Sequence, residues 1–431
     1  MTTIGSLSSS STYSSSTKTS SSQASSTFSD AAVTSTTSKA GDANSTVMSS
    51  LATLRQNALS SFLQTFLDAL ENGTNNSDSD TPYESQEKTY LNGGDGDDEI
   101  SAKSNAIIEG GEGDDNIEAM WYSAVDGGDG DDTISVYDNS VAYGGAGNDR
   151  INTYSSSYVD GGEGNDYIST AENSEVYGGA GADEIDTYEN SKVYGGSGND
   201  TIRTYENSYV DGGVGDDTIS VGKNSTVIGG EGDDRIDMGG GLESFVDAGV
   251  GNDVIMGGAT VLAGDGDDTI IGGKNVDAGA GNDVLVSRTT STATLSGGGG
   301  DDILWVGGGK TIKFGLGDGN DNLNVSRNGN TLELGEGLNA EDMQVSLSGN
   351  TATITFAGNT TDSITIEFSG YHTGNSISTM GHVEFADSLT VSFADGSTMT
   401  IEPETLGTEA DYLSFERHAG ELQSHSLTLF Q

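Results

Sequence analysis

The chain has 431 residues, of which 68 are acidic and 16 are basic, so its formal net charge at pH 7 is −52. This charge argues against nucleic acids and anionic membranes as partners, and it favours cations or basic surfaces. The sequence contains no Cys, no run of 18 apolar residues and no apolar N-terminal segment of the kind found in cleaved signals. We therefore expect no transmembrane segment and no cleaved secretion signal.

The N-terminal region is expected to consist of three parts. Residues 1–48 contain 27 Ser or Thr, a composition typical of a disordered tail. In residues 49–72, apolar side chains from Leu51 to Leu70 recur at helical spacing and predict an amphipathic helix, which would cover one end of the next domain or pair with a second copy. A membrane-surface role is less favoured, because Arg55 is the one basic residue of this segment. Residues 73–92 have the composition of a polar linker.

Between residues 93 and 304 the sequence repeats the phrase Gly-Gly-x-Gly-x-Asp-x-Ile. Nine copies start 17 residues apart, from Gly93 to Gly229. The period then changes to 19, 15, 15 and 19 residues, and Ala replaces the first Gly at Ala248, Ala263 and Ala278. Thirteen copies at nearly constant spacing predict a repeat architecture, in which each unit packs mainly on its neighbours.

The residues of the phrase predict a site for a hard cation. Gly permits positive φ and close backbone approach, so the carbonyl oxygens of a tight turn can converge, and Asp at the sixth position adds a carboxylate. Oxygen ligands in a flexible cage favour Ca²⁺ over Mg²⁺, and the absence of Cys and His from the repeats argues against zinc or copper. The candidate ligands are the sixth-position aspartates Asp98, Asp115, Asp132, Asp149, Asp166, Asp183, Asp200, Asp217, Asp234, Asp253, Asp268, Asp283 and Asp302.

The phrase resembles the calcium-binding nonapeptide repeat of RTX proteins, also called the haemolysin-type repeat. The resemblance implies an all-β fold, a right-handed parallel β-roll or β-solenoid with Ca²⁺ between successive coils. Here alternate half-coils carry the phrase, so we expect multiple Ca²⁺ along one edge of a roll formed by residues 93–325. RTX proteins are usually exported by the type I machinery, which implies a secreted, extracellular protein with an uncleaved signal in the C-terminal tail, residues 406–431.

The half-coil without the phrase has its own pattern. Counted from each first Gly, Ile at offset seven and Ile, Val or Ala at offset fifteen are expected to point inward from two strands. Asn recurs at offset twelve, as at Asn190 and Asn207, and Ser recurs at offset thirteen. Asn tolerates the left-handed conformation and both residues bond local backbone, so we predict a metal-free turn that closes each coil.

Residues 326–405 are predicted to form a β-rich C-terminal cap domain. Four runs alternate as antiparallel strands do: 343–347, 351–356, 363–368 and 389–393. The run 335–342 together with 383–387 resembles the domain that often follows haemolysin-type calcium repeats, and its expected role is to close the end of the roll. Just before this domain, a decayed copy of the phrase makes Asp321 a further candidate ligand.

No enzyme motif stands out in the sequence. Neither His-Glu-x-x-His nor Gly-x-Ser-x-Gly occurs, and acid pairs such as Asp97 and Asp98 recur at every turn, as cation ligands would. We expect a non-enzymatic calcium-binding protein that folds on Ca²⁺ outside the cell and has a structural, adhesive or host-surface role. The alternative is an extracellular polysaccharide-binding or polysaccharide-modifying protein using the tyrosines at offset ten, Tyr137, Tyr154, Tyr188 and Tyr205. A cross-strand ladder is the simpler explanation of these tyrosines.

Overall fold

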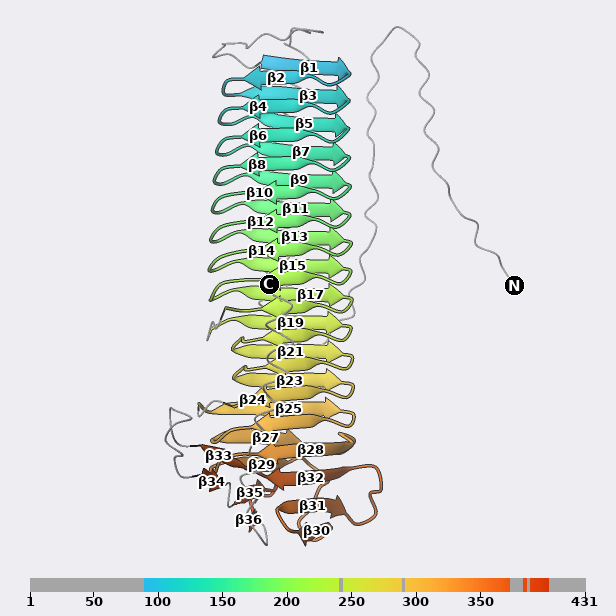
Figure 1. Cartoon of the computed structure of the whole chain (residues 1–431), viewed down its shortest axis with the longest axis vertical. Coiled ribbons are helices and arrows are strands. Elements are labelled where there is room, and N and C mark those ends of the chain that lie inside the picture. The colour runs from blue at the N-terminus through green and yellow to red at the C-terminus, as the bar shows by residue number, and fades with distance from the viewer. Residues whose placement is uncertain (1–88, 240–242, 289–290, 373–382, 386–387, 403–431) are drawn as a thin grey trace, which may run out of the picture. The chain divides into compact units, whose positions relative to one another are not determined.

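The repeat block folds as a parallel β-solenoid of about 14 coils (Figure 1). The computed structural model describes residues 89–239, 243–288, 291–372, 383–385 and 388–402. Every regular element in them is a strand, and they contain no helix that could cross a membrane. The all-β solenoid predicted from the repeats is therefore confirmed, whereas the expected tail, helix and C-terminal signal lie outside the described residues.

Each coil contains one long strand and one short strand. The long strands run into the glycine phrase: β1 (Thr89–Asp95), β3 (Ala106–Glu112), β5 (Ala124–Asp129), β7 (Val141–Ala146), β9 (Tyr158–Glu163), β11 (Glu175–Ala180), β13 (Lys192–Ser197), β15 (Tyr209–Val214), β17 (Thr226–Glu231), β19 (Phe245–Val250), β21 (Thr260–Asp265), β23 (Asn275–Ala280), β25 (Ala293–Gly299) and β27 (Lys310–Phe314). The short strands follow the sixth-position Asp: β2 (Glu99–Ala102), β4 (Asn116–Ala119), β6 (Thr133–Val136), β8 (Arg150–Thr153), β10 (Tyr167–Ser169), β12 (Glu184–Asp186), β14 (Thr201–Arg203), β16 (Thr218–Ser220), β18 (Arg235–Asp237), β20 (Val254–Met256), β22 (Thr269–Ile271), β24 (Val284–Ser287), β26 (Ile303–Val306) and β28 (Asn320–Val325). The first strand thus begins inside the segment that composition alone suggested as a linker.

Long strands pair with long strands and short strands with short strands, in two parallel sheets. The register is one repeat, so that Val193 of β13 lies beside Val210 of β15. Where the period changes the register follows it: Thr226 pairs with Phe245, and Phe245 with Thr260. The insertions and deletions fall in the connection that lacks the glycine phrase, and equivalent residues therefore stay stacked along the whole solenoid.

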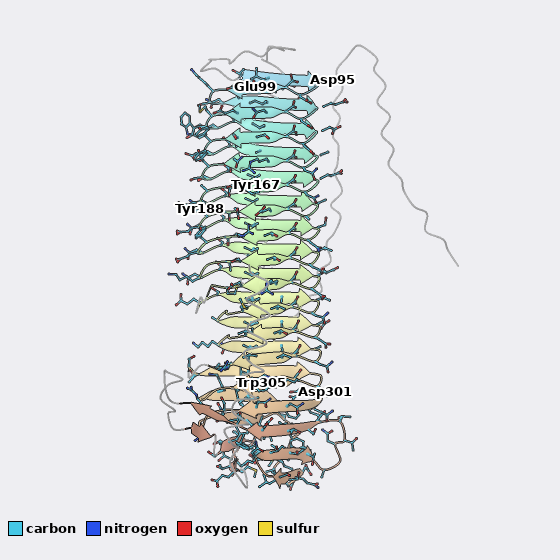
Figure 2. The ribbon with its side chains drawn as sticks, in the orientation of Figure 1. Asp95, Glu99, Tyr167, Tyr188, Asp301 and Trp305 are labelled. Atoms are coloured by element: carbon cyan, nitrogen blue, oxygen red, sulfur yellow. The ribbon has the colours of Figure 1, made fainter. Side chains whose placement is uncertain are left out.

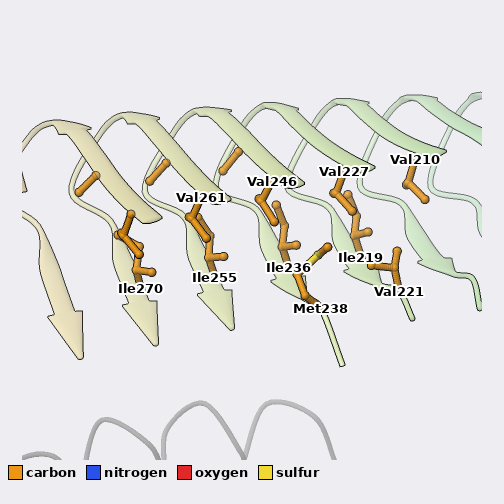
Figure 3. Close-up of a cluster of buried hydrophobic side chains, with 14 of the residues drawn as sticks. Val210, Ile219, Val221, Val227, Ile236, Met238, Val246, Ile255, Val261 and Ile270 are labelled. Atoms are coloured by element: carbon orange, nitrogen blue, oxygen red, sulfur yellow. The ribbon is translucent and has the colours of Figure 1, made fainter. Parts of the chain in front are cut away.

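Two columns of aliphatic side chains form the core between the sheets. Ile219 and Ile236 from the short strands and Val227 and Val246 from the long strands are completely buried. Figure 3 shows these side chains meeting across the interior of successive coils. The inward positions predicted at offsets seven and fifteen are confirmed, and the apolar core of each coil is thin.

In most of the 17-residue coils, the second turn, after the short strand, carries the recurrent Asn and Ser, whereas the 15-residue coils have Gly-Gly at this turn. Asn190 and Asn207 both have a φ of 59°, in the left-handed region that was predicted from the residue type. The buried Ser174 donates from Oγ to the carbonyl of Ala171 at 3.2 Å, and its backbone N–H donates to Oγ of Ser191 in the next coil at 3.4 Å. These residues close the coil locally and also connect it to its neighbour; we call this segment the asparagine turn.

The C-terminal strands extend both solenoid sheets and then change direction. They are β29 (Thr331–Leu334), β30 (Met343–Ser348), β31 (Thr351–Phe356), β32 (Ser363–Phe368), β33 (Gly370–His372), β34 (Val383–Phe385), β35 (Leu389–Ser392) and β36 (Thr398–Ile401). The four strands predicted in this region are all present. β32 pairs in parallel with β28 and β35 with β29, and antiparallel β31, β30 and β36 follow. Each sheet is thereby continued past the last parallel coil by an antiparallel hairpin, as a cap requires.

Candidate metal centre

The glycine phrase forms the turn between each long strand and the next short strand. These glycine turns line one edge of the solenoid, which Figure 2 marks near its two ends with Asp95 and Asp301. The sixth-position Asp lies at the inner side of the turn, and from Asp115 to Asp302 its exposed fraction is at most 2%. Asp98 of the first coil is half-buried. Folding therefore places a column of carboxylates inside the edge, one per coil.

From Asp115 onwards, one oxygen of each carboxylate accepts a hydrogen bond from the preceding coil. The backbone N–H of Asp183 donates to Oδ1 of Asp200 at 2.8 Å, and that of Asp200 donates to Oδ1 of Asp217 at the same distance. The bond recurs from Asp98 to Asp321 without interruption. This contact orients every carboxylate in the same way, and it joins successive coils at the predicted ligand.

The other oxygen of each carboxylate has no partner. Oδ2 is buried and lacks a hydrogen bond in thirteen aspartates, Asp98, Asp115, Asp132, Asp149, Asp166, Asp183, Asp200, Asp217, Asp234, Asp253, Asp268, Asp283 and Asp302. Leaving a buried carboxylate oxygen without a donor is costly, because its desolvation is not compensated. Thirteen buried carboxylate oxygens without a hydrogen bond, at the thirteen predicted ligands, fit the requirements of a cation site at this edge.

The space beside Oδ2 is a cradle bounded by oxygen atoms. A Cβ added to the first Gly of the phrase at Gly93 would lie 2.6 Å from Oδ2 of Asp98 and 2.6 Å from the carbonyl oxygen of Gly110 in the next coil. A carboxylate of one coil and a carbonyl of the next therefore converge on one point. Among the described residues no three acidic or His side chains gather around one point. Carbonyls would thus supply much of the coordination, which is typical of Ca²⁺ sites.

The fourth Gly of the phrase is required by the backbone. Gly113 has a φ of 126°, and a Cβ there would collide with the backbone of Gly96 in the preceding coil. The first position is less strict, since Ala248, Ala263 and Ala278 occupy it in three coils. Their methyl groups take the place that is open beside the other carboxylates, so these three coils have a narrower cradle.

Burial dominates the electrostatics of the carboxylate column. The pKa of Asp183 is raised to about 7, mainly by burial and to a smaller extent by the charges of Asp200 and Asp166, against the lowering effect of the hydrogen bond from the backbone N–H of Asp166. The same causes raise the pKa of Asp234 to about 8 and that of Asp132 to about 6. Without a cation, then, the folded state disfavours the charged form of these side chains at neutral pH.

The fifth position of the phrase, which the sequence analysis grouped with the sixth as a cation ligand, has a different role in the structure. Its side chain is exposed, and it accepts a hydrogen bond from the backbone N–H of the equivalent residue in the following coil. The backbone N–H of Asp216 donates to Asn199 Oδ1 at 3.0 Å, and the backbone N–H of Asp233 donates to Asp216 Oδ1 at 2.9 Å. The recurrence of Asp or Asn at this position was the available signal. Of each acid pair, the second member faces the cradle, while the first holds neighbouring coils together.

Asp321 extends the column by one coil. Its Oδ1 accepts the backbone N–H of Asp302 at 3.1 Å, and burial raises its pKa to about 8. It occupies the place that a fourteenth carboxylate would take, although the glycine phrase before it has decayed. Its assignment as a ligand remains a prediction, as does that of the other thirteen.

The tyrosines at offset ten lie beyond the short strands, beside the asparagine turns. Tyr137 and Tyr154 stack with ring centroids 4.7 Å apart, and Tyr188 and Tyr205 stack at 5.0 Å. Figure 2 shows Tyr188 projecting from the edge opposite to that of Asp95 and Asp301. The rings form cross-strand ladders, the simpler of the two explanations, and the edge that carries them is separate from the carboxylate column.

Comparison with known families agrees with the repeat pattern. The family model of the RTX calcium-binding nonapeptide repeat matches residues 137–168, 153–174, 187–206, 244–259 and 294–310. All of these matches lie within the solenoid. A comparison with curated proteins produced no match.

Proposed function

Because the chain carries RTX calcium-binding repeats, we propose that it is a secreted, non-enzymatic protein whose solenoid folds when Ca²⁺ occupies the cradles outside the cell. The observation that carries the proposal is the row of thirteen buried Oδ2 atoms without a partner. The stacked coils also present long outer columns of side chains, a type of surface that repeat proteins use for binding. We assign the folded protein a structural or adhesive role at an extracellular or host surface.

The geometry explains why binding and folding would be coupled. Each cradle takes oxygens from two adjacent coils, as at Asp98 and Gly110, so a site exists only when both coils are folded. The binding free energy of the ion then contributes directly to folding. Extracellular modules bind Ca²⁺ with Kd of about 10⁻⁴ to 10⁻³ M, so they fill outside the cell and stay empty in the cytosol.

The ligand assignment is tested with two matched double variants of the full chain. Asp217→Asn with Asp234→Asn removes two buried carboxylates and retains an acceptor at Oδ1. Asp216→Asn with Asp233→Asn makes the same chemical change one residue earlier, at the exposed position. Calcium stoichiometry is measured by isothermal titration calorimetry, and folding by circular dichroism with and without chelator.

The buried pair should lower the stoichiometry by about two ions, because each coil contributes one carboxylate. It should also make the metal-free chain easier to fold at neutral pH, since neutral amides replace repelling carboxylates. The exposed pair should leave the stoichiometry unchanged. If both pairs lost the same number of ions, or the buried pair lost none, the assignment of the cradles would be wrong.

Export by the type I machinery is the second part of the proposal. It is supported by the usual route of proteins with this repeat, and it places the uncleaved signal in residues 406–431. Removing these residues should abolish appearance of the protein in the medium of a host that has the export machinery, while leaving the intracellular amount unchanged. Equal export of the truncated chain would refute this location of the signal.

Polysaccharide binding is a second candidate function, favoured by a hollow on the outer face of the short strands. Its lining includes Glu118, Ser135, Tyr137, Asn152 and Tyr154, a mixture of aromatic and hydrogen-bonding side chains that is typical of sugar-binding surfaces. A glycan array probed with the calcium-loaded protein, and with an Asn152→Ala variant, tests it. If the variant bound the same glycans as strongly as the original protein, the glycan site would not be in this hollow.

A further inference from the structure

The ladder of stacked tyrosines beside the asparagine turns is interrupted at one coil, which has no aromatic side chain at the equivalent position. Tyr137 and Tyr154 form one stacked pair, and Tyr188 and Tyr205 form the other. Between the two pairs, Ala171 occupies the equivalent position. Tyr154 and Tyr188 are 53% and 52% exposed, which is high for stacked rings. We call the space above Ala171, between Tyr154 and Tyr188, the tyrosine gap.

Hydrogen bonds show that Ala171 and Tyr154 are equivalent in three dimensions. Thr153 Oγ1 contacts the carbonyl of Tyr154 at 3.4 Å, and Thr170 Oγ1 contacts that of Ala171 at the same distance. The Ser hydroxyl of each asparagine turn donates to the same two carbonyls at 3.2 Å. The turn hydrogen bonds are thus the same at both positions, although the strand pairing ends one residue earlier between β8 and β10 than between β6 and β8. The aromatic side chain is what is missing at Ala171.

The stacking geometry gives the width of the gap. Within the pairs the ring planes differ by 6° and 5°, and the centroid separations match the spacing of about 4.8 Å between neighbouring strands. The rings therefore stack along the solenoid axis, and each pair turns one free face towards the gap. Tyr154 and Tyr188 are two coils apart, about 9.6 Å, so a group midway lies about 4.8 Å from both ring centroids.

This separation is within the range of cation–π attraction. An ammonium group within about 6 Å of a Tyr centroid is attracted by the negative face of the ring, and two faces act on it here. An aromatic ring has the same spacing in the two stacked pairs, so it is the surrounding negative charge that favours a cation in the gap. Glu172 and Glu189, next to Ala171 and Tyr188 in the chain, are exposed at the rim. Their charges add to the field of a protein with a net charge of −52.

We propose that the tyrosine gap, formed by Tyr154, Ala171 and Tyr188 with Glu172 and Glu189 at its rim, binds an organic ammonium group. The chemistry fits a quaternary ammonium, as in choline, and the amine of an amino sugar. The site is on the edge opposite to the carboxylate column, and it depends on the cradles only in requiring a folded solenoid.

The test uses the full chain loaded with calcium and observes tyrosine resonances by NMR during titration. Choline and glucosamine are the cationic probes. Their neutral counterparts are 3,3-dimethyl-1-butanol, which has the shape of choline, and N-acetylglucosamine. The cationic probes should shift the resonances of Tyr154 and Tyr188 with saturation, and the neutral probes should bind at least tenfold more weakly. The ratio of the two cationic affinities identifies the source of the ammonium group.

Three variants locate the site. Ala171→Tyr continues the ladder through the gap and should weaken binding of the better probe at least tenfold, as should Tyr188→Leu. Tyr137→Leu removes a ring of the same ladder that does not face the gap, and it should change the affinity less than twofold. Glu172→Gln should weaken binding severalfold at low salt and less at high salt. Circular dichroism and calcium stoichiometry confirm that every variant is folded.

Specific results would overturn the proposal. Equal affinity for choline and dimethylbutanol would show an apolar slot without cation recognition. Unchanged binding by Ala171→Tyr would show that the ligand lies outside the gap. If Tyr137→Leu weakened binding as much as Tyr188→Leu, the ligand would lie in the hollow beside Tyr137. If N-acetylglucosamine shifted the resonances of Tyr137 with saturation, that hollow would be a site for a neutral sugar.

Discussion

Without calcium, the solenoid should be folded at acid pH and unfolded at alkaline pH. The buried carboxylates have folded-state pKa values of about 6 to 8, as at Asp132 and Asp234, against an ordinary value of 3.8. A raised folded-state pKa means that protonation stabilises the fold. This stabilisation is complete below about pH 4, it decreases as the pH rises above that value, and its loss is complete once the pH has passed the folded-state values of about 6 to 8.

The size of the effect follows from single sites. A pKa of about 7 is roughly 3 units above the ordinary value, which corresponds to about 4 kcal/mol of stability lost per carboxylate once the pH exceeds 7. Four aspartates share this value, Asp149, Asp183, Asp200 and Asp268. The charge of Asp200 raises the pKa of the neighbouring Asp183, so the separate losses overlap and are not simply additive. A loss of this size at only a few coils is comparable with the roughly 5–15 kcal/mol that stabilises a typical domain, so ionisation should unfold the metal-free chain.

The assay is circular dichroism of the full chain in chelator, titrated from pH 4 to pH 8, beside a calcium-loaded sample. The metal-free sample should lose its β-sheet signal as the pH rises from about 4 to 8, and the calcium-loaded sample should keep it. Asp217→Asn with Asp234→Asn should move the metal-free midpoint to higher pH, because two ionising groups are gone. A full β-sheet signal in chelator at pH 8 would refute the reasoning.

Four further substitutions are predicted to separate the functions of the turns. Asn190→Ala should destabilise the calcium-loaded solenoid by about 1 kcal/mol, because Ala disfavours the left-handed backbone, without changing stoichiometry; thermal unfolding and calorimetry measure both quantities. Gly178→Ala should weaken calcium binding at one site, because it places a methyl group in the cradle beside Asp183. Ala263→Gly removes such a methyl group and should strengthen calcium binding at its own site. If calorimetry showed tighter binding for the first variant and weaker binding for the second, the proposed position of the ion would be wrong. Ala182 interrupts the row of fifth-position side chains that accept a backbone N–H from the next coil, and Ala182→Asn supplies the missing acceptor. This variant should raise the free energy of unfolding by about 0.5–1 kcal/mol, measured by chemical denaturation. An unchanged free energy would show that these hydrogen bonds do not stabilise the solenoid.

Much of the candidate site was predictable because its residues recur at a fixed spacing. The sixth-position Asp, exemplified by Asp183, was identifiable as a candidate ligand since Gly-rich turns and carboxylates are what a hard cation requires. The neighbouring fifth position was wrongly grouped with it, because Asp216 and Asp217 differ only in the direction of their side chains. One points to solvent and holds the next coil, and the other is buried beside the cradle.

The sequence by itself determined the period of the solenoid, the inward columns such as Ile219 and Val227, the left-handed turns and the strands of the cap. These features depend on local residue preferences and on side-chain alternation, which are legible along the chain. Only the tertiary structure decided which atoms meet between coils: that Oδ2 of Asp98 faces a carbonyl of the next coil, and that Tyr154 and Tyr188 enclose a gap. Such contacts join residues about one or two repeats apart, and their geometry exists only once parallel strands have set the distance between coils.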